Sequence, residues 1–397
     1  MVPFSSSARN MRSSEIRRLM KLAADPTLIS FAGGSPSPTL FPIDVVDELY
    51  NGLSLQQKQA AMQYGPTDGY PPLREELKKY LTSKGMNLEG QELLITTGAQ
   101  QAINLISKVF LDPGDVVITE YPSFIGALAA FKSYEAVTTG VEMDDEGIVI
   151  SELLKTLDKH GPKAKLLYLS PYFHNPAGII YSERRKTELM KALEGREICL
   201  LEDDPYGELY FNEEDRTLTV PMKTFENQPV PVCYMGSFAK IFGPGLRLGW
   251  LLAPEEIVNK CQLAKQSMDA CSSTFTQVLA AEYLSKNKLP GYLEKLRPAY
   301  KRRASIMLDA LKEHMPEYVT WTTPKGGFYI WVTLPEEMNS SDVFDETIKN
   351  GAAFVIGKAF DPKGKKNNSF RLAFSNTPEK RIAEGVKIVA DAVKKCM

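Results

Sequence analysis

One lysine of this sequence, Lys240, lies in a setting that suits covalent chemistry. It follows the small polar start Ser237-Phe238-Ala239 and precedes a Gly/Pro-rich turn that ends at Arg247. A lysine that loses solvent in such a pocket loses part of its preference for the charged form. Its amine can then attack a carbonyl and form a Schiff base. Most lysines are exposed, so this interpretation depends on the residues that accompany Lys240.

Acidic residues end one apolar run of the sequence. Glu202, Asp203 and Asp204 follow residues 198–201, and Pro205 and Tyr206 come next. Carboxylates at the end of a buried strand are unfavourable unless a cation or a donor meets them. A protonated pyridine nitrogen would be such a partner for one aspartate, and Tyr206 could donate to an oxygen of the same ring. The alternative is a solvated turn.

An anion site is indicated where the apolar run 92–97 turns directly into a helix. Ala99 and Gln100 would begin that helix, and its free N–H groups and dipole favour a phosphate. Ser237 and Arg247, on either side of Lys240, could hold the same phosphate, the arginine as a fixed fork. Taken alone, a turn of this kind is weak support for an anion site.

Three more residues are candidates for binding a ligand. Phe124 follows the apolar run 116–119 and could stack on a planar ring, although a core aromatic is the commoner meaning of such a residue. Asn175 begins the turn Asn175-Pro176-Ala177-Gly178 and could bond a ring oxygen; ordinary turns share this pattern. Arg371 interrupts the apolar run 369–374, where an arginine is unfavourable unless it pairs, and a substrate carboxylate would be a suitable partner.

The elements that would position these residues alternate between short apolar strands and helices. We expect strands at 92–97, 116–119, 136–139, 165–170, 198–204, 232–237 and 248–252. This pattern predicts an α/β fold, with a large, mostly parallel (mixed) sheet sandwiched by helices. Ligands bind such sheets at the carboxyl ends of the strands, where the residues above fall.

The second half of the chain predicts a smaller α+β unit. Residues 257–285 and 291–314 are expected to be helical, the latter as a long linking helix. Strands at 327–332 and 369–374 and a helix at 378–395 follow. With 397 residues the chain is too long for one ordinary core. We expect a large domain over 46–290 and a second unit formed by 1–45 together with 291–397.

Composition excludes several classes of protein. A net charge of −2 gives no basic surface that would favour nucleic-acid binding. The sequence also contains no run of 18 apolar residues, so it predicts no membrane span. Five scattered cysteines and three histidines suggest neither disulfides nor a metal site, and they favour a cytoplasmic protein. The Ser/Arg-rich N-terminus allows a targeting segment. Apolar residues at 16, 19, 20 and 22 instead favour a helical arm over 13–24.

Several of these stretches together resemble the fold-type I, class I/II aminotransferases that depend on pyridoxal 5'-phosphate (PLP). The resemblance extends from residue 30 to the last helix and is strongest toward the 2-aminoadipate and kynurenine aminotransferase subgroup. It is carried by residues 175–178, 203–206, 237–240, 245–249 and 371–375, with 31–34, 63–66 and 98–101 in support. It implies a PLP-fold enzyme that moves an amino group from an L-amino acid to a 2-oxo acid, most often 2-oxoglutarate.

The resemblance also implies roles for single residues. Lys240 would carry PLP and move the proton at the substrate Cα, while Asp203 would meet the pyridine nitrogen. Phe124 would stack on the ring, and Asn175 and Tyr206 would hold its phenolic oxygen. The phosphate would be bound by Ala99, Gln100, Ser237 and Arg247. Two departures are Ala239, where relatives often carry serine, and Phe124, where tyrosine is frequent.

Substrate and partner follow from the same resemblance. Arg371 would grip the α-carboxylate with help from Asn175, and Gly34 would line the entrance. Tyr64 would reach the phosphate of a neighbouring subunit, which implies a homodimer. Arg17 could meet a distal carboxylate of a 2-aminoadipate-like donor, although a solvated helix face is the commoner role of such an arginine. Aromatic and branched-chain donors are equally open.

Other activities share the same cofactor residues. A PLP-dependent β-lyase, a decarboxylase or a cyclopropane-forming synthase would need the same lysine, aspartate and phosphate site. A non-enzymatic alternative is the effector sensor of a transcription regulator that carries a winged-helix domain. The segment before residue 30 is short for such a domain, and the net charge is not basic.

Overall fold

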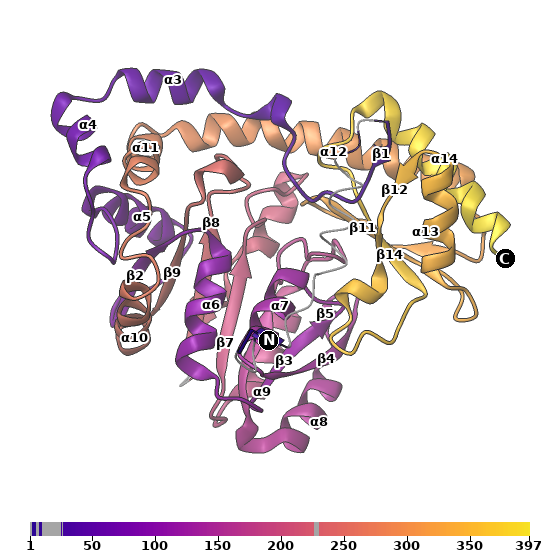
Figure 1. Ribbon diagram of the computed structural model, residues 1–397, viewed down its shortest axis with the longest axis horizontal. Coiled ribbons are helices and arrows are strands. Elements are labelled where there is room, and N and C mark those ends of the chain that lie inside the picture. Colours follow the sequence, from indigo (N-terminus) through magenta and orange to yellow (C-terminus); the bar gives the residue numbers. More distant parts are fainter. Residues whose placement is uncertain (1, 5–7, 10–24, 26, 226–229) are drawn as a thin grey trace.

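The computed structural model describes residues 2–4, 8–9, 25, 27–225 and 230–397 (Figure 1). The expected N-terminal helix over 13–24, and Arg17 within it, lie outside the described residues. Among the described helices, none combines the length and the apolar character needed to cross a membrane.

A mixed sheet of eight strands forms the larger part of the molecule. Its order is β2-β9-β8-β7-β6-β3-β4-β5. The strands are β2 (Gln91–Thr96), β3 (Val116–Tyr121), β4 (Val137–Asp144), β5 (Gly147–Ile148), β6 (Ala164–Leu169), β7 (Cys199–Asp204), β8 (Val232–Ser237) and β9 (Gly249–Pro254). Strands β4, β3, β6, β7 and β8 run parallel, whereas β9 is antiparallel to both of its neighbours.

Helices cover both faces of this sheet, which explains its uninterrupted apolar strands. Leu166 and Tyr168 of β6 pack into a core with α6 (Ala99–Phe110), α7 (Ile125–Ser133) and α10 (Glu255–Gln266). Leu167 and Leu169 point to the opposite face, toward α8 (Ile150–His160) and α9 (Glu183–Leu193). Side chains alternate along a strand, so a strand buried on both faces must be apolar throughout. The predicted α/β class is confirmed.

One helix prediction is wrong. The stretch 257–285 is not continuous: α10 ends at Gln266 and α11 (Thr274–Ser285) begins after a break. Ala270 lies in this break with a φ of 61°, a left-handed conformation that interrupts the α-helical backbone. The long linking helix is confirmed as α12 (Lys288–His314).

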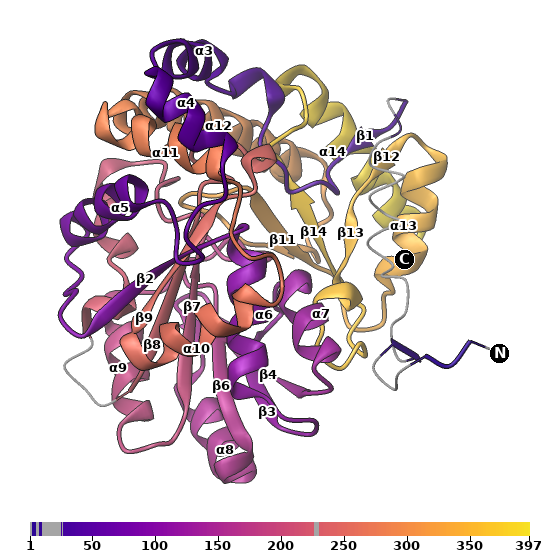
Figure 2. The same ribbon diagram turned by 60° about the vertical axis from the view of Figure 1, so that its left-hand side comes forward.

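A second, antiparallel sheet lies beside the first (Figure 2). Its order is β10-β11-β14-β13. It consists of β10 (Thr320–Trp321), β11 (Tyr329–Thr333), β13 (Val355–Ile356) and β14 (Ser369–Ala373), accompanied by α13 (Ser340–Lys349) and α14 (Glu379–Lys395). Figure 1 shows α12 running from α11 to this unit. The short strand β1 (Ile29–Ser30) pairs with β12 (Ala352–Ala353). The division at residues 46 and 290 stays a prediction.

Three helices of the N-terminal region, α3 (Ile43–Asn51), α4 (Leu55–Met62) and α5 (Pro71–Ser83), lie along α11. The register of the large sheet then determines where the functional residues meet. Asp203 at the end of β7 pairs with Met235 of β8, and Ser237 at the end of β8 pairs with Gly249 of β9. The carboxyl ends of these parallel strands therefore share one edge of the sheet, at which open α/β sheets bind ligands.

Candidate active site

Lys240 follows β8 and turns its amine toward the smaller sheet. Its Nζ donates a 3.2 Å hydrogen bond to the carbonyl oxygen of Gly34. The same nitrogen lies 5.6 Å from the ring centre of Tyr206 and 5.5 Å from that of Phe328. Burial, and then the positive charge of Arg371, lower the pKa of Lys240 from 10.5 to about 8. A useful fraction of this amine is therefore uncharged near neutral pH.

Asp203 is buried at the end of β7, and one of its two carboxylate oxygens has no hydrogen-bond partner among the described residues. Its Oδ2 accepts a 2.7 Å hydrogen bond from the hydroxyl of Tyr168. Its Oδ1 is buried and has no hydrogen-bond partner among the described residues. Burial raises the pKa of Asp203 to about 7, against the lowering effect of the Tyr168 hydrogen bond. Such an oxygen needs a donor, and a cationic donor best of all.

Arg371 extends from β14 to the turn that contains Asn175. Its Nη1 donates to Oδ1 of Asn175 at 2.8 Å, and its Nη2 donates to the carbonyl oxygen of Ala32 at 2.7 Å. Its Nε is buried and lacks a partner among the described residues. The guanidinium carbon lies 4.5 Å from the ring centre of Tyr329 and 5.0 Å from that of Phe360. Among the described residues, no carboxylate forms an ion pair with this buried cation, so a ligand anion suits it.

The predicted anion site lies where β2 turns into α6. Gly98 precedes the helix with a φ of 79° and provides no side-chain cap, so the first N–H groups of α6 remain available. Arg247 is exposed, and among the described residues it donates long hydrogen bonds of 3.4 Å to the carbonyl oxygens of Pro244 and Thr97. The Oγ of Ser237 accepts from the backbone N–H of Ala239 at 3.1 Å, which leaves its hydroxyl hydrogen free to donate.

Gln100 and Phe124 contact the same glycine. The side-chain amide of Gln100 donates to the carbonyl oxygen of Gly126 at 2.9 Å. A Cβ atom at Gly126 would lie 2.5 Å from Cζ of Phe124 and equally close to Oε1 of Gln100. Glycine at 126 thus lets the ring of Phe124 pack beside the start of α6.

Tyr64 stands apart from this cluster in the single chain. It follows α4 and is 87 % exposed, in a region that also exposes Leu55 and Met62. A large aromatic side chain so exposed is unusual in a monomer and is typical of an interface. The other predicted residues that the structure describes lie around one edge of the large sheet, whereas the ring of Tyr64 lies in solvent.

Sequence analysis missed two tyrosines of the site. Tyr168 holds Asp203, and Tyr329 brings its hydroxyl within 2.8 Å of the hydroxyl of Tyr206. Both lie in apolar strands, where their rings look like core residues. The one available signal was the hydroxyl group itself, because a buried tyrosine usually finds a hydrogen-bond partner.

A buried network also holds the turn that contains Asn175. Glu120 accepts hydrogen bonds from the Ser170 N–H at 2.9 Å and the Tyr181 hydroxyl at 2.8 Å, and it contacts Nε2 of His174 at 3.1 Å. The Ala177 N–H donates to Nδ1 of His174, so Nε2 carries the hydrogen in the neutral ring. This network fixes both ends of the turn without touching the site itself.

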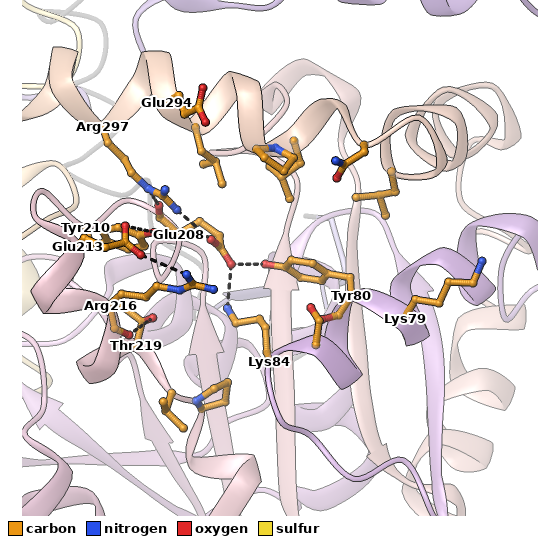
Figure 3. A pocket seen from close by; sticks show the side chains of 18 of the residues that line it. Lys79, Tyr80, Lys84, Glu208, Tyr210, Glu213, Arg216, Thr219, Glu294 and Arg297 are labelled. Atoms are coloured by element: carbon orange, nitrogen blue, oxygen red, sulfur yellow. Dashed lines mark hydrogen bonds and ion pairs between the residues drawn. The ribbon is translucent and has the colours of Figure 1, made fainter.

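A cavity of about 860 Å³ lies on the other side of the β7 end (Figure 3). Asp204, the neighbour of Asp203, is bonded on that side by the Tyr234 hydroxyl at 2.7 Å. In the cavity, Glu208 accepts from Tyr80 at 2.6 Å and pairs with Lys84 at 3.3 Å, as Figure 3 shows. None of the described residues that line this cavity has a buried polar atom without a partner, in contrast to Asp203 and Arg371 beside Lys240.

A comparison with known families decides which chemistry this site belongs to. The family described as "Aminotransferase class I and II" matches residues 35–389. The chain belongs to this family. It is also 38 % identical over 398 residues to aromatic-amino-acid aminotransferase 1 of Thermococcus litoralis, with 99 % of this chain and 94 % of that protein covered.

Two further relatives support the same assignment. The aminotransferase is 35 % identical to 2-aminoadipate transaminase of Thermus thermophilus, with 98 % of this chain and 96 % of that protein covered. Its fold matches a solved structure of Pyrococcus horikoshii kynurenine aminotransferase with a TM-score of 0.94 at 40 % identity, covering 99 % and 97 % of the two chains. The predicted family, fold type and PLP-dependent transaminase activity are confirmed. The roles of single residues stay predictions.

Proposed function

We propose that Lys240 carries PLP in this aminotransferase and that the amino donor is an aromatic L-amino acid, with 2-oxoglutarate as the acceptor. The observation that carries the first part is the buried, unpartnered Oδ1 of Asp203. The second part rests on the aromatic rings around Arg371. Each step below concerns what the chain's own side chains do.

Asp203 fits the ring nitrogen of PLP. Tyr168 occupies its Oδ2, which leaves Oδ1 as the buried acceptor. A protonated ring nitrogen supplies the missing donor and the missing charge together, and it lowers the raised pKa of Asp203 by charge pairing. When bound, PLP provides the carbonyl that takes up the amino group and the ring that accepts the electron pair from the substrate Cα.

Lys240 acts twice in this scheme. As an amine with a pKa of about 8, it has roughly a tenth of its population uncharged at pH 7, which suffices for attack on a carbonyl. Once the substrate amine has displaced it, Lys240 is a free amine close to the substrate. It would then remove the proton from Cα and deliver it to the carbon of PLP that carried the carbonyl, and it would move a proton in the opposite direction in the second half of the reaction.

Arg371 and Asn175 orient the substrate. The buried guanidinium has an unpartnered Nε and a second hydrogen on each Nη, so it can grip the α-carboxylate. Asn175 accepts from Arg371 through Oδ1, which leaves its amide N–H groups to donate. At the opposite end of the site, the α6 N-terminus, Ser237 and Arg247 hold the phosphate.

An aromatic donor suits the walls beside Arg371. The rings of Tyr329 and Phe360 lie within 5.0 Å of the guanidinium carbon, and Trp331 meets Phe360 edge to face at 5.6 Å. Mostly apolar walls with a few polar anchors favour an apolar side chain. Two of the relatives named above are an aromatic-amino-acid and a kynurenine aminotransferase. A 2-aminoadipate-like donor would depend on Arg17.

The donor can be identified without an acceptor. Purified, PLP-loaded enzyme is mixed with phenylalanine, kynurenine, 2-aminoadipate or leucine at equal concentration, and the loss of its visible absorbance is followed. The aromatic donors are expected to react fastest. Fastest reaction with 2-aminoadipate, abolished by Arg17→Ala, would assign the donor to the distal-carboxylate class instead. Formation of glutamate from 2-oxoglutarate identifies the acceptor.

A homodimer in the cytoplasm completes the proposal. The exposed ring of Tyr64 and the exposed apolar residues of α3 and α4 suit an interface with a second copy of the chain. In that dimer Tyr64 binds the phosphate in the partner's site. All five cysteines are free, as expected in a reducing compartment.

A further inference from the structure

Tyr206 and Tyr329 meet from different sheets. Tyr206 follows β7 of the eight-stranded sheet, and Tyr329 begins β11 of the four-stranded sheet. Their hydroxyl oxygens lie 2.8 Å apart, and the two residues are only 4 % and 1 % exposed. The rings meet edge to face with their centres 5.7 Å apart. The contact is a buried hydrogen bond between the two sheets, beside Lys240.

A count of hydrogens decides which hydroxyl donates when a ligand is present. Each tyrosine has one hydroxyl hydrogen, so only one of the two donates in this contact. The other acceptor for Tyr329 is the carbonyl oxygen of Gly34 at 3.5 Å, beyond the usual range of about 2.5–3.0 Å. The oxygen of Tyr206 is therefore the better acceptor for Tyr329.

We propose that Tyr329 is a positioning residue that donates its hydroxyl hydrogen to Tyr206 and so directs the hydrogen of Tyr206 to the phenolic oxygen of PLP. The inference rests on the proposed function, because it requires Tyr206 to bind that oxygen. Hydrogen bonds in series polarise one another, so the bond from Tyr206 is strengthened.

Gly34 provides the space that this arrangement needs. A Cβ atom at residue 34 would lie 2.1 Å from the hydroxyl oxygen of Tyr329 and 2.8 Å from its Cζ. Any side chain there would displace the buried ring of Tyr329 from Tyr206. Gly34 thus affects the cofactor's hydrogen bond through Tyr329, in addition to lining the entrance.

The pH dependence of the visible absorbance reports on this hydrogen bond without turnover. When PLP is bonded to Lys240, one proton is shared between the linking nitrogen and the phenolic oxygen. A hydrogen bond donated to that oxygen competes with the shared proton. It therefore lowers the pKa at which this proton is lost. Loss of the hydrogen bond therefore moves the midpoint of the absorbance titration to higher pH.

The experiment titrates PLP-loaded wild-type enzyme and three single variants. Tyr206→Phe is expected to raise the midpoint by about one pH unit, the size of one charge-assisted hydrogen bond. Tyr329→Phe keeps its ring against Arg371 and is expected to raise the midpoint by about half a unit. Tyr210→Phe is the matched control. It removes the hydroxyl of a buried tyrosine in the same loop, one that bonds Glu213 at 3.1 Å, and should leave the midpoint unchanged.

The double variant distinguishes positioning from an independent effect. Because Tyr329 acts only through Tyr206, the double variant with both phenylalanines should have the midpoint of Tyr206→Phe alone. A further upward shift in the double variant would overturn the inference, as would an unshifted midpoint for Tyr329→Phe in the wild-type background. An unshifted Tyr206→Phe would instead refute the role proposed for Tyr206 and remove this inference with it.

Gly34→Ala provides a second route if Tyr329→Phe fails to fold or to hold PLP. It leaves both hydroxyls in the chain and only separates them. The expected midpoint is again higher than that of wild type, with no further shift when Gly34→Ala is combined with Tyr206→Phe. A normal midpoint for Gly34→Ala would show that the tyrosine contact does not govern the titration, and would count against the inference.

Discussion

Tyr168 and Asp203 lie on neighbouring strands, and the Tyr168 hydroxyl donates a 2.7 Å hydrogen bond to Oδ2 of Asp203. In the proposed site, this bond decides which carboxylate oxygen of Asp203 remains for the ring of PLP. It also lowers the pKa of Asp203, which burial alone would raise further. Tyr168, a residue of the packed sheet interior, thus adjusts the pKa of Asp203.

Tyr168→Phe should weaken the enzyme without unfolding it. The ring still packs edge to face on Phe131, but the pKa of Asp203 rises and its hold on a protonated ring nitrogen weakens. We expect kcat/KM to fall about tenfold, the size of one hydrogen bond to a charged group. Steady-state kinetics with the identified donor measure this, and unchanged kcat/KM would contradict the role given to Tyr168.

The stability of the apoprotein should depend on Asp203 and pH. The pKa of Asp203 is raised from 3.8 to about 7 in the folded state, so the folded protein binds the proton more tightly than the unfolded chain. Stability from this group is present below its unfolded pKa and is lost as pH rises toward about 7. Asp203→Asn does not titrate and should therefore be more stable than wild type at about pH 8.

Chemical denaturation of PLP-free protein at about pH 4, pH 7 and pH 8 checks this sign. The gain from Asp203→Asn over wild type should grow between about pH 4 and pH 7 and then level off. A gain that is equal at both ends of this range would mean that the carboxyl group does not titrate as stated. Asp269→Asn, at a partly exposed aspartate with a lowered pKa, provides a control of opposite sign.

Lys240→Ala should abolish transamination. It removes both the amine that bonds PLP and the group that moves the Cα proton, so turnover should fall by at least about 10³-fold. The visible band of the lysine-bound cofactor should also disappear. A small added amine is expected to restore part of the activity. Lys265→Ala, at a buried lysine paired with Asp269, is a suitable control for the loss of a buried lysine. Full activity in Lys240→Ala would defeat the assignment.

Arg371→Lys should raise KM more than it lowers kcat. Lysine keeps the positive charge but loses the planar fork that grips a carboxylate and holds Asn175 at 2.8 Å. The expected loss is about 2–3 kcal/mol, or roughly 30- to 150-fold in KM for the donor. An unchanged KM would mean that another residue binds the α-carboxylate.

A mixing experiment tests whether Tyr64 acts across a dimer interface. Tyr64→Ala and Lys240→Ala homodimers should both have low activity, the first through weak phosphate binding. Co-refolded together, they form mixed dimers in which one site has Lys240 from one chain and Tyr64 from the other. Activity should return to about a quarter of wild type, since about half of the dimers are mixed and each has one complete site. No recovery would place Tyr64 in its own chain's site.

How far the sequence predicts this fold depends on the range of the contacts involved. Buried strands such as β6 and β7 were predictable, because apolar runs bounded by turns identify them locally. The antiparallel direction of β9 was not, because it follows from how the chain returns to the sheet after the Lys240 turn. The break between α10 and α11 was missed because apolar residues continue across Ala270.

By itself, the sequence determined which reactive residue types lie in or directly after the strands. They are the lysine after β8, the aspartate at the end of β7, and the arginine within β14. Each belongs to a short motif whose chemistry is readable in place. Only the tertiary structure decided that Oδ1 of Asp203 stays free, and that Tyr329 meets Tyr206, 123 residues away. These contacts depend on strand register and on the packing of one sheet beside another, which no local pattern encodes.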